Sequence, residues 1–363
     1  MSKVKKPVLL IGGIPGNNAE EVFRSVAPIL GDLAIGLTDG ETGLRRYWIY
    51  FVFLNTWMKH PDLMLIRPPT PPPGGPEWVG KDYGSIQWYG LKQLGLNKLS
   101  RVETLGYPIE AADSYELFSR LRDQGVIPRG ARFQQCIPFP EDAVRLYTNN
   151  ARNMELMVDA YVDVLKRDLA LMCAQIPHED LVLQWDINWE TIAIEHGDYL
   201  SNEAPLQFKP NGDPMERFLR YIKELNAHIP AGVQVGLHLC YGDLAHKHFK
   251  EPKSVGTSVL MANNAQKVSP RPINFVQMSV PINRSDDAFF EPLEDLKFGD
   301  GTVYAGLLHY RDGIKGSKKR LAAFKRHYKG PTGVSTECGL GRRPANQKLK
   351  KLFELHREVA AAI

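Results

Sequence analysis

Short apolar runs alternate along most of this chain with stretches of helical periodicity. Eight runs are predicted to be strands, at residues 7–12, 33–38, 131–137, 180–186, 233–240, 273–279, 302–308 and 331–336. The runs are nearly continuous in apolar residues, which is typical of parallel strands covered on both faces. Apolar positions recur at helical spacing in 141–175, 214–227 and 345–362. Strands that alternate with helices in this way predict a (β/α)8 TIM barrel of the α/β class.

Residues 46–130 interrupt this alternation. The segment 67–80 reads R-P-P-T-P-P-P-G-G-P-E-W-V-G, and it cannot enter a central strand because proline lacks the backbone donor that a strand ladder needs. Two interpretations stay open, a lid over the barrel mouth or an outer embellishment without a function. We predict a single domain over 1–363, with 46–130 as an insertion after the second strand.

Composition and charge narrow the class of protein. The chain is 43% hydrophobic and 24% charged, which is typical of a soluble globular protein. Its 45 basic and 41 acidic residues give a net charge of +4, which argues against a nucleic-acid or anionic membrane partner. No apolar run approaches the roughly 20 residues of a membrane span. The chain has only 4 cysteines, spread along its length, which favours a reducing compartment and predicts a cytoplasmic protein.

A short motif and one distant cysteine predict a metal site. His238 and Cys240 are two positions apart on a predicted strand, so their side chains point to the same face. Cys338, in S-T-E-C-G-L-G-R-R, is a third ligand that can complete the site. Zinc held by one histidine and two cysteines keeps its fourth position open for water or substrate, as in catalytic sites. The alternative is that these side chains are buried packing groups.

Polar residues follow several of the predicted strands. In β/α barrels the chemistry gathers at the carboxyl ends of the strands. From these positions we predict His309 and Asp186 as catalytic residues, and Glu41, Asp39, Asp186, Trp185 and Arg45 as substrate-binding residues. A histidine at such a place is suited to proton exchange near neutral pH. Asp39 has the alternative role of a helix cap, and Trp185 that of a packing residue.

Four motifs follow one another in the order known from one enzyme family. They are G-G-I-P after the first predicted strand, D-G-E after the second, H-L-C after the fifth and E-C-G-L-G-R-R after the eighth. Together they resemble the catalytic barrel of cobalamin-independent methionine synthase. That barrel belongs to a superfamily with uroporphyrinogen decarboxylase and the corrinoid:coenzyme M methyltransferases. The resemblance covers nearly the whole chain, and H-x-C with a late C-G-L is its specific part.

The resemblance implies a zinc-dependent methyl or alkyl transferase. His238, Cys240 and Cys338 would bind Zn²⁺, and an acceptor thiol would be held as a nucleophilic thiolate. Glu41 and Asp186 would face an ammonium group of that acceptor. The partners implied are a small-molecule thiol and a methyl donor, which is a folate, a methylcorrinoid or a methoxylated small molecule. With a methylcorrinoid, a corrinoid protein becomes a further partner.

The chain departs from the family pattern at several places. The family supplies a glutamate zinc ligand from the end of the sixth strand, where this chain reads V-Q-M-S-V-P over 276–281 and has no carboxylate. Gly13 stands where the family has a serine that helps hold the carboxylate of homocysteine. Asp186 is kept, but Asn188 follows where the family has an Asp-Glu-Pro run. We therefore expect an acceptor other than homocysteine.

Two functions of other classes stay open. A metal-free lyase or decarboxylase of the uroporphyrinogen decarboxylase type would use Asp186, Arg45 and Arg46 to stabilise charge on a carboxylated substrate. A non-catalytic zinc or cofactor carrier would use the barrel as a scaffold, since a fold alone does not establish an activity. Metal content separates the lyase from the transferase, and turnover separates the carrier from both.

Overall fold

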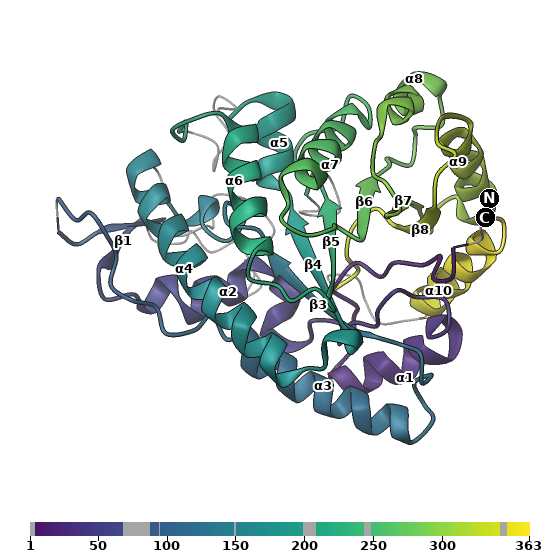
Figure 1. Ribbon diagram of the computed structural model, residues 1–363, viewed down its shortest axis with the longest axis horizontal. Coiled ribbons are helices and arrows are strands. Elements are labelled where there is room, and N and C mark those ends of the chain that lie inside the picture. The colour runs from purple at the N-terminus through teal and green to yellow at the C-terminus, as the bar shows by residue number, and fades with distance from the viewer. Residues whose placement is uncertain are drawn as a thin grey trace, which may run out of the picture.

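A six-stranded parallel sheet forms the centre of the protein (Figure 1). The computed structural model describes residues 4–67, 88–93, 95–148, 150–198, 208–242, 248–341 and 347–363. The strands of the sheet, in spatial and chain order, are β3 (Phe133–Pro138), β4 (Leu181–Ile187), β5 (Gln234–Leu239), β6 (Phe275–Ser279), β7 (Thr302–Leu308) and β8 (Thr332–Thr336). Each of them overlaps one of the predicted strands.

The first two predicted strands, at 7–12 and 33–38, connect the two edges of this sheet. They are marked by single bridges instead of regular ladders. Val8 forms parallel bridges with Val334 of β8 and with Ala34, and Leu37 forms one with Phe133 of β3. Backbone hydrogen bonds accompany each junction. The eight segments thus follow one another around a ring, as predicted for a (β/α)8 barrel.

Helices surround the ring on its outer side (Figure 1). They are α1 (Ala19–Leu30), α3 (Tyr107–Asp123), α4 (Ala151–Gln175), α5 (Trp189–His196), α6 (Pro214–Asn226), α7 (Gly256–Val268), α8 (Asp287–Phe290), α9 (Gly313–His327) and α10 (Gln347–Ala360). Because α1 packs against both α3 and α10, the outer layer closes where the two ends of the chain meet. Within the described residues, no helix has the length and apolar character needed to cross a membrane.

The predicted insertion at 46–130 contains two different parts. Its elements are the end of η1 (Gly43–Tyr47), then α2 (Ile49–Asn55), η2 (Trp57–Lys59), the antiparallel hairpin of β1 (Leu63–Arg67) and β2 (Trp88–Leu91), and α3. Helix α3 packs against α1 and α4 and so belongs to the helical layer. The proline-rich segment lies outside the described residues, and a lid remains a prediction.

Helix α4 begins ten residues later than the predicted range of 141–175. Asn150 caps it, because its side chain accepts a hydrogen bond from the backbone of Asn153 at 2.8 Å. The preceding loop holds buried charges that need partners. In that loop Arg145 lies 3.0 Å from Asp198, and both side chains are almost fully buried. The loop satisfies these charges, so the chain cannot continue the helix there.

Strand β4 illustrates how the ring directs polar groups to one end. Alternation puts Val182, Gln184 and Asp186 on one face of the strand. Val182 belongs to a small apolar cluster that is separate from the main core between strands and helices. Asp186 lies at the carboxyl end, where it accepts a 2.7 Å hydrogen bond from Gln184. The face is thus apolar at one end and polar at the carboxyl end.

Candidate functional site

The three predicted metal ligands lie together at the carboxyl ends of the strands. His238 and Cys240 come from the end of β5, and Cys338 follows β8. Their ligand atoms all lie within 4.8 Å of one another, and the two sulfurs are 3.5 Å apart. His238 and Cys240 are only 3% and 4% exposed, and Cys338 is half-buried. The spacing rule for a strand and the distant thiol therefore led to one cluster, which we call the donor cluster.

The surroundings of the donor cluster suit a metal ion. Gln277 Oε1 lies 2.6 Å from His238 Nδ1, and a neutral ring that donates from Nδ1 keeps its lone pair on Nε2. The backbone N–H of Gly242 donates to Cys240 Sγ at 3.3 Å, a contact that favours the thiolate. One imidazole nitrogen and two sulfurs are a donor set that Zn²⁺ prefers. The residues present therefore fit zinc.

A second group, the acid cluster, lies next to the donor cluster. It consists of Glu41, Cys136 and Asp186, whose ligand atoms also lie within 4.8 Å of one another. Asp186 of β4 stands opposite His238 of β5 in the strand register, so the two clusters are neighbours. Cys136, at the end of β3, was not among the predicted site residues. Its place one strand before Asp186, near a strand end, is the signal that points to it.

A strained turn directs Glu41 into the acid cluster. Its φ angle of 51° lies in the left-handed region that residues with a side chain rarely adopt. The carboxylate of Asp39 accepts a 2.9 Å hydrogen bond from the backbone N–H of Glu41, which holds the turn. Gly12 and Gly13 make room, because a Cβ atom there would lie 3.1 and 3.3 Å from Glu41 Oε2. Strain of this kind is typical of functional positions.

Burial controls the charge of the acid cluster. Burial and the neighbouring Asp186 raise the pKa of Glu41 well above its usual value. Burial raises the pKa of Asp186 to about 6, although His238 acts in the opposite direction. Burial also raises the pKa of the Cys136 thiol. Glu41 and the Cys136 thiol therefore favour their protonated forms near neutral pH, and a positively charged group placed beside the cluster would favour the ionised carboxylates.

Two predicted substrate-binding residues, Asp39 and Arg45, are engaged with each other. Arg45 donates to both carboxylate oxygens of Asp39 and lies 2.9 Å from Glu110 of α3. Ser114 donates to Asp39 at 2.6 Å. Burial alone would raise the pKa of Asp39, but Arg45, with the hydrogen bonds from Ser114 and the Glu41 backbone, lowers it. This geometry supports a role in holding the D-G-E turn and gives no support to the predicted contact with a substrate.

Trp185 lies away from both clusters. Its side chain is 0% exposed, its indole N–H donates to Asn226 of α6 at 2.9 Å, and its ring packs edge-on against Phe139. The cause is strand alternation, because Asp186 faces the interior of the ring and its neighbour must face the helices. The prediction that Trp185 contacts a substrate therefore has no support, and the alternative of a packing residue describes it.

His309 lies beside the segment that bears Cys338. Its Nδ1 is 3.8 Å from a carboxylate oxygen of Glu337, and its Nε2 is 2.8 Å from the carbonyl oxygen of Val280. Burial lowers the pKa of His309. His248, which was not predicted as a site residue, contacts the other oxygen of Glu337 at 3.0 Å. His309 is thus close to the donor cluster, and its predicted catalytic role stays a prediction.

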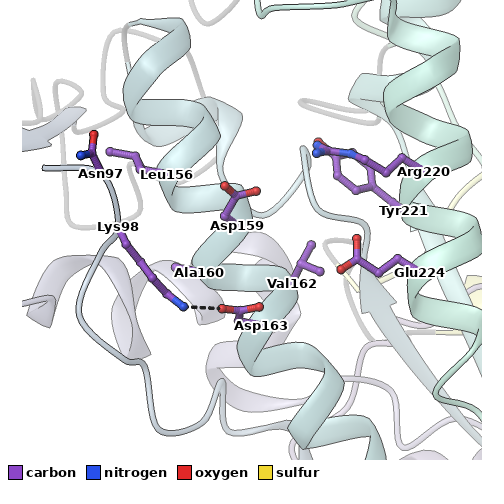
Figure 2. A pocket seen from close by; sticks show the side chains of 10 residues that line it. All are labelled: Asn97, Lys98, Leu156, Asp159, Ala160, Val162, Asp163, Arg220, Tyr221 and Glu224. Atoms are coloured by element: carbon purple, nitrogen blue, oxygen red, sulfur yellow. Dashed lines mark hydrogen bonds and ion pairs between the residues drawn. The ribbon is translucent and has the colours of Figure 1, made fainter.

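A groove on the outer surface is a separate feature (Figure 2). Its volume is about 250 Å³, and charged side chains of α4 and α6 line it. Lys98 lies 3.3 Å from Asp163 across it, and Arg220 stacks on Tyr221. None of its lining residues belongs to the donor or acid cluster. Lys98 and Asp163 pair with each other and Glu224 pairs with Lys166, which lies outside the lining, so the groove supplies no evidence of a ligand.

Comparison with known proteins supports the fold but not a specific family. No model of a known protein family matches the chain, and no curated protein sequence matches it. A B12-independent methionine synthase from Shewanella sp. W3-18-1, in complex with selenomethionine, superposes with a TM-score of 0.59 at 11% identity and covers 99% of this chain and 98% of that one. A proposed vitamin-B12-independent methionine synthase from Listeria monocytogenes gives 0.58 at 12% identity, covering 99% and 97%.

The ring of strands with its helices is a β/α barrel. Among such barrels the chain has the fold of the B12-independent methionine synthases over almost its entire length, as the motifs predicted. At this level of identity the likeness concerns the fold, so the activity has to be argued from the site.

Proposed function

We propose that this protein is a zinc-dependent methyl or alkyl transferase whose acceptor is a thiol. The observation that carries the proposal is the meeting of His238, Cys240 and Cys338 within 4.8 Å at the barrel mouth. Three protein ligands leave a coordination position for a substrate, which is the pattern of catalytic zinc. The fold shared with methionine synthases supports the same chemistry.

Each cluster has its own task in the proposed reaction. Zinc, when bound, lowers the pKa of an acceptor thiol so that its sulfur is nucleophilic at neutral pH. Glu41 and Asp186 bind a positively charged group of the acceptor and so orient its sulfur toward the donor cluster. The burial of His238, Cys240 and Asp186 limits the access of water to the sulfur. His309 exchanges a proton with the donor fragment that leaves.

The substrates are proposed by class. The acceptor is a small-molecule thiol other than homocysteine, because Gly13 and Asn188 lack the side chains that the family pattern supplies. The methyl donor is a folate, a methylcorrinoid delivered by a corrinoid protein, or a methoxylated small molecule. A cytoplasmic location, without nucleic-acid or membrane partners, accompanies this proposal.

The engagement of Arg45 argues against the metal-free lyase. A lyase of that type needs cations to stabilise a carboxylated substrate, whereas Arg45 is already bound by Asp39 and Glu110. The donor cluster would have no task in such an enzyme. The carrier alternative keeps the metal and differs only in turnover, so an assay with methyl donors separates it.

Metal content is the first test. We expect about one zinc per chain in wild-type protein purified without added metal, and a large loss in Cys240→Ala. Cys173→Ala is the matched control, because Cys173 is also buried but lies on α4, outside both clusters. Metal-free wild-type protein, prepared without chelators, would sink the proposal.

A second measurement tests thiol activation. In the cobalt-substituted protein, thiols are expected to change the visible absorption spectrum, and the corresponding thioethers are not. Methyl transfer is then measured with a panel of thiols and the three donor classes. Metal binding with an unchanged spectrum across the thiol panel, and no consumption of donor, would favour the carrier.

A further inference from the structure

One buried amide connects the two segments that carry the donor cluster. Gln277 of β6 stands opposite His238 of β5 in the strand register and is 0% exposed. Its Oε1 lies 2.6 Å from His238 Nδ1. Its Nε2 donates to the carbonyl oxygens of Thr336 and Glu337, at 3.2 and 3.3 Å. The side chain therefore reaches from the metal-ligating histidine to the backbone next to Cys338.

The two carbonyl groups fix which way the amide faces. Carbonyl oxygens only accept hydrogen bonds, so the NH₂ group of Gln277 must point to Thr336 and Glu337. The oxygen of the amide must then point to His238, and an oxygen only accepts. The hydrogen in that contact therefore belongs to Nδ1 of the imidazole. The neutral ring carries its lone pair on Nε2 as a consequence.

We propose that Gln277 is the positioning residue of the metal centre: it fixes the His238 tautomer and ties the Cys338 segment to that histidine. This rests on the proposed function, since the metal is the ligand that the donor cluster would hold. Residue 277 lies in the stretch 276–281, near which the family pattern supplies a carboxylate ligand. The hydrogen bonds indicate that residue 277 holds a metal ligand in place and does not bind the metal itself.

A neutral amide at this place also sets the charge of the centre. A divalent zinc with two thiolates and a neutral imidazole has no net charge. A carboxylate ligand at position 277 would make the set negative, and an incoming thiolate would then add a second negative charge. Gln277 thus favours binding of an anionic sulfur.

Ser279, two positions further along β6, allows the two tasks of Gln277 to be separated, namely fixing the His238 tautomer and tying the Cys338 segment to that histidine. Its hydroxyl lies 2.9 Å from the carbonyl oxygen of Glu337 and 3.1 Å from that of Leu239, and no hydrogen bond to His238 is formed. Ser279→Ala removes a tie to the Cys338 segment and leaves the contact between Gln277 and His238 in place. It therefore measures the effect of the tie alone.

Metal affinity tests the proposal through competition with a chromophoric chelator, using zinc and cobalt. Gln277→Leu is expected to weaken binding by about 10–100-fold, the usual effect of losing such a partner of a ligand. Gln277→Glu retains an acceptor for His238 and should lose less. Asn226→Leu is the matched control, because it removes an equally buried amide that bonds Trp185 and Ser269. It should reduce stability without changing the affinity. An affinity of Gln277→Leu within about twofold of the wild type would overturn the proposal.

The tautomer of His238 gives a readout that needs no metal. In metal-free protein, at a pH where the ring is neutral, ¹⁵N NMR is expected to show a protonated Nδ1 and an unprotonated Nε2. In Gln277→Leu both tautomers should be populated. A wild-type ring protonated at Nε2 would refute the assignment even if zinc binds. If zinc does not bind, the proposed function fails while the tautomer still decides on Gln277.

Discussion

The donor cluster and the acid cluster lie side by side at the barrel mouth, yet they present different atoms. The donor cluster offers one imidazole nitrogen and two sulfurs, and hydrogen bonds with Gln277 and Gly242 hold two of these groups in place. The acid cluster offers two carboxylates and a thiol whose pKa values are all raised, mainly by burial. The first suits a soft divalent metal, and the second suits a group whose main property is positive charge.

This difference suits the two clusters to bind different groups of one substrate. A thiol that carries a positive charge can place its sulfur at the donor cluster and its charge at the acid cluster. Each cluster alone would bind many small molecules, whereas the pair selects for both groups at a fixed separation. The two clusters form one site if variants of either cluster abolish the task of the other, so metal binding and acceptor binding have to be measured separately.

Removal of charge from the acid cluster should have the largest effect. Glu41→Gln and Asp186→Asn preserve the size of the side chains, but each removes a buried charge that the substrate would pair with. We expect kcat/KM for the acceptor to fall by about 100-fold or more. Zinc content should remain that of the wild type. Glu110→Gln, on the half-exposed side chain that contacts Arg45, is the control. Loss of zinc in both acid-cluster variants would show that the acid cluster takes part in metal binding and that the two clusters form one site.

A second buried histidine, His356, differs from His238 in its surroundings. His356 on α10 is 1% exposed, and its Nδ1 contacts the carbonyl oxygen of Leu352 at 2.7 Å. Its Nε2 is buried, and within the described part of the chain it has no hydrogen-bond partner. Burial lowers its pKa from 6.5 to about 4. Burial alone therefore does not make a histidine a ligand, because no sulfur completes a cluster here.

His356 predicts how stability depends on pH. Since its pKa is lower in the folded state, the folded protein binds fewer protons than the unfolded chain between pH 6.5 and about 4. The contribution of His356 to the free energy of unfolding is fully present above that window. It is lost as the pH falls through the window, by an amount on the order of 3 kcal/mol. Denaturant unfolding at a series of pH values across this range gives the free energy of unfolding, which should change less steeply with pH in His356→Leu than in the wild type. The exposed His228→Leu serves as control. An unchanged slope in His356→Leu would contradict the assignment.

The donor cluster was predictable because its rule is local. Two residues on one strand face the same way when they are two positions apart, and His238 and Cys240 obey that rule. The same rule, applied to β4, assigns Trp185 to the face opposite Asp186. The prediction of Trp185 as a substrate contact was therefore avoidable from the sequence, once Asp186 was placed inside the ring.

Other parts of the site depend on contacts that no local rule contains. Arg45 pairs with Glu110 on α3, which becomes a neighbour only when that helix packs against the barrel. Gln277 meets His238 because of the register between β5 and β6, which the sequence does not specify. The first two strands were found by their apolar runs, although single bridges are all that join them to the sheet. Their place in the ring comes from packing.

Gly12 tests how Glu41 is placed, with a smaller expected effect. Its φ angle is +50°, and an added Cβ would lie 3.1 Å from Glu41 Oε2 and 3.3 Å from Cys136 Sγ. Gly12→Ala should reduce stability by about 1–2 kcal/mol through backbone strain. It should also raise the KM for the acceptor, because the carboxylate is displaced. Gly130→Ala is the control, since a Cβ there meets no atom within 4 Å. Equal stability of the two variants would show that the turn tolerates a side chain.

Cys136 should give the smallest effect, and it tests the boundary between the clusters most directly. It is a third sulfur near the barrel mouth, and its Sγ accepts a 3.5 Å hydrogen bond from Gln134. Cys136→Ala should reduce stability by about 1 kcal/mol because a small cavity remains. Zinc content should stay at the wild-type level, in contrast to Cys240→Ala, because the raised pKa keeps the Cys136 thiol protonated and a thiol is a poor ligand. Loss of zinc equal to that of Cys240→Ala would make Cys136 a ligand and would end the separation between donor cluster and acid cluster.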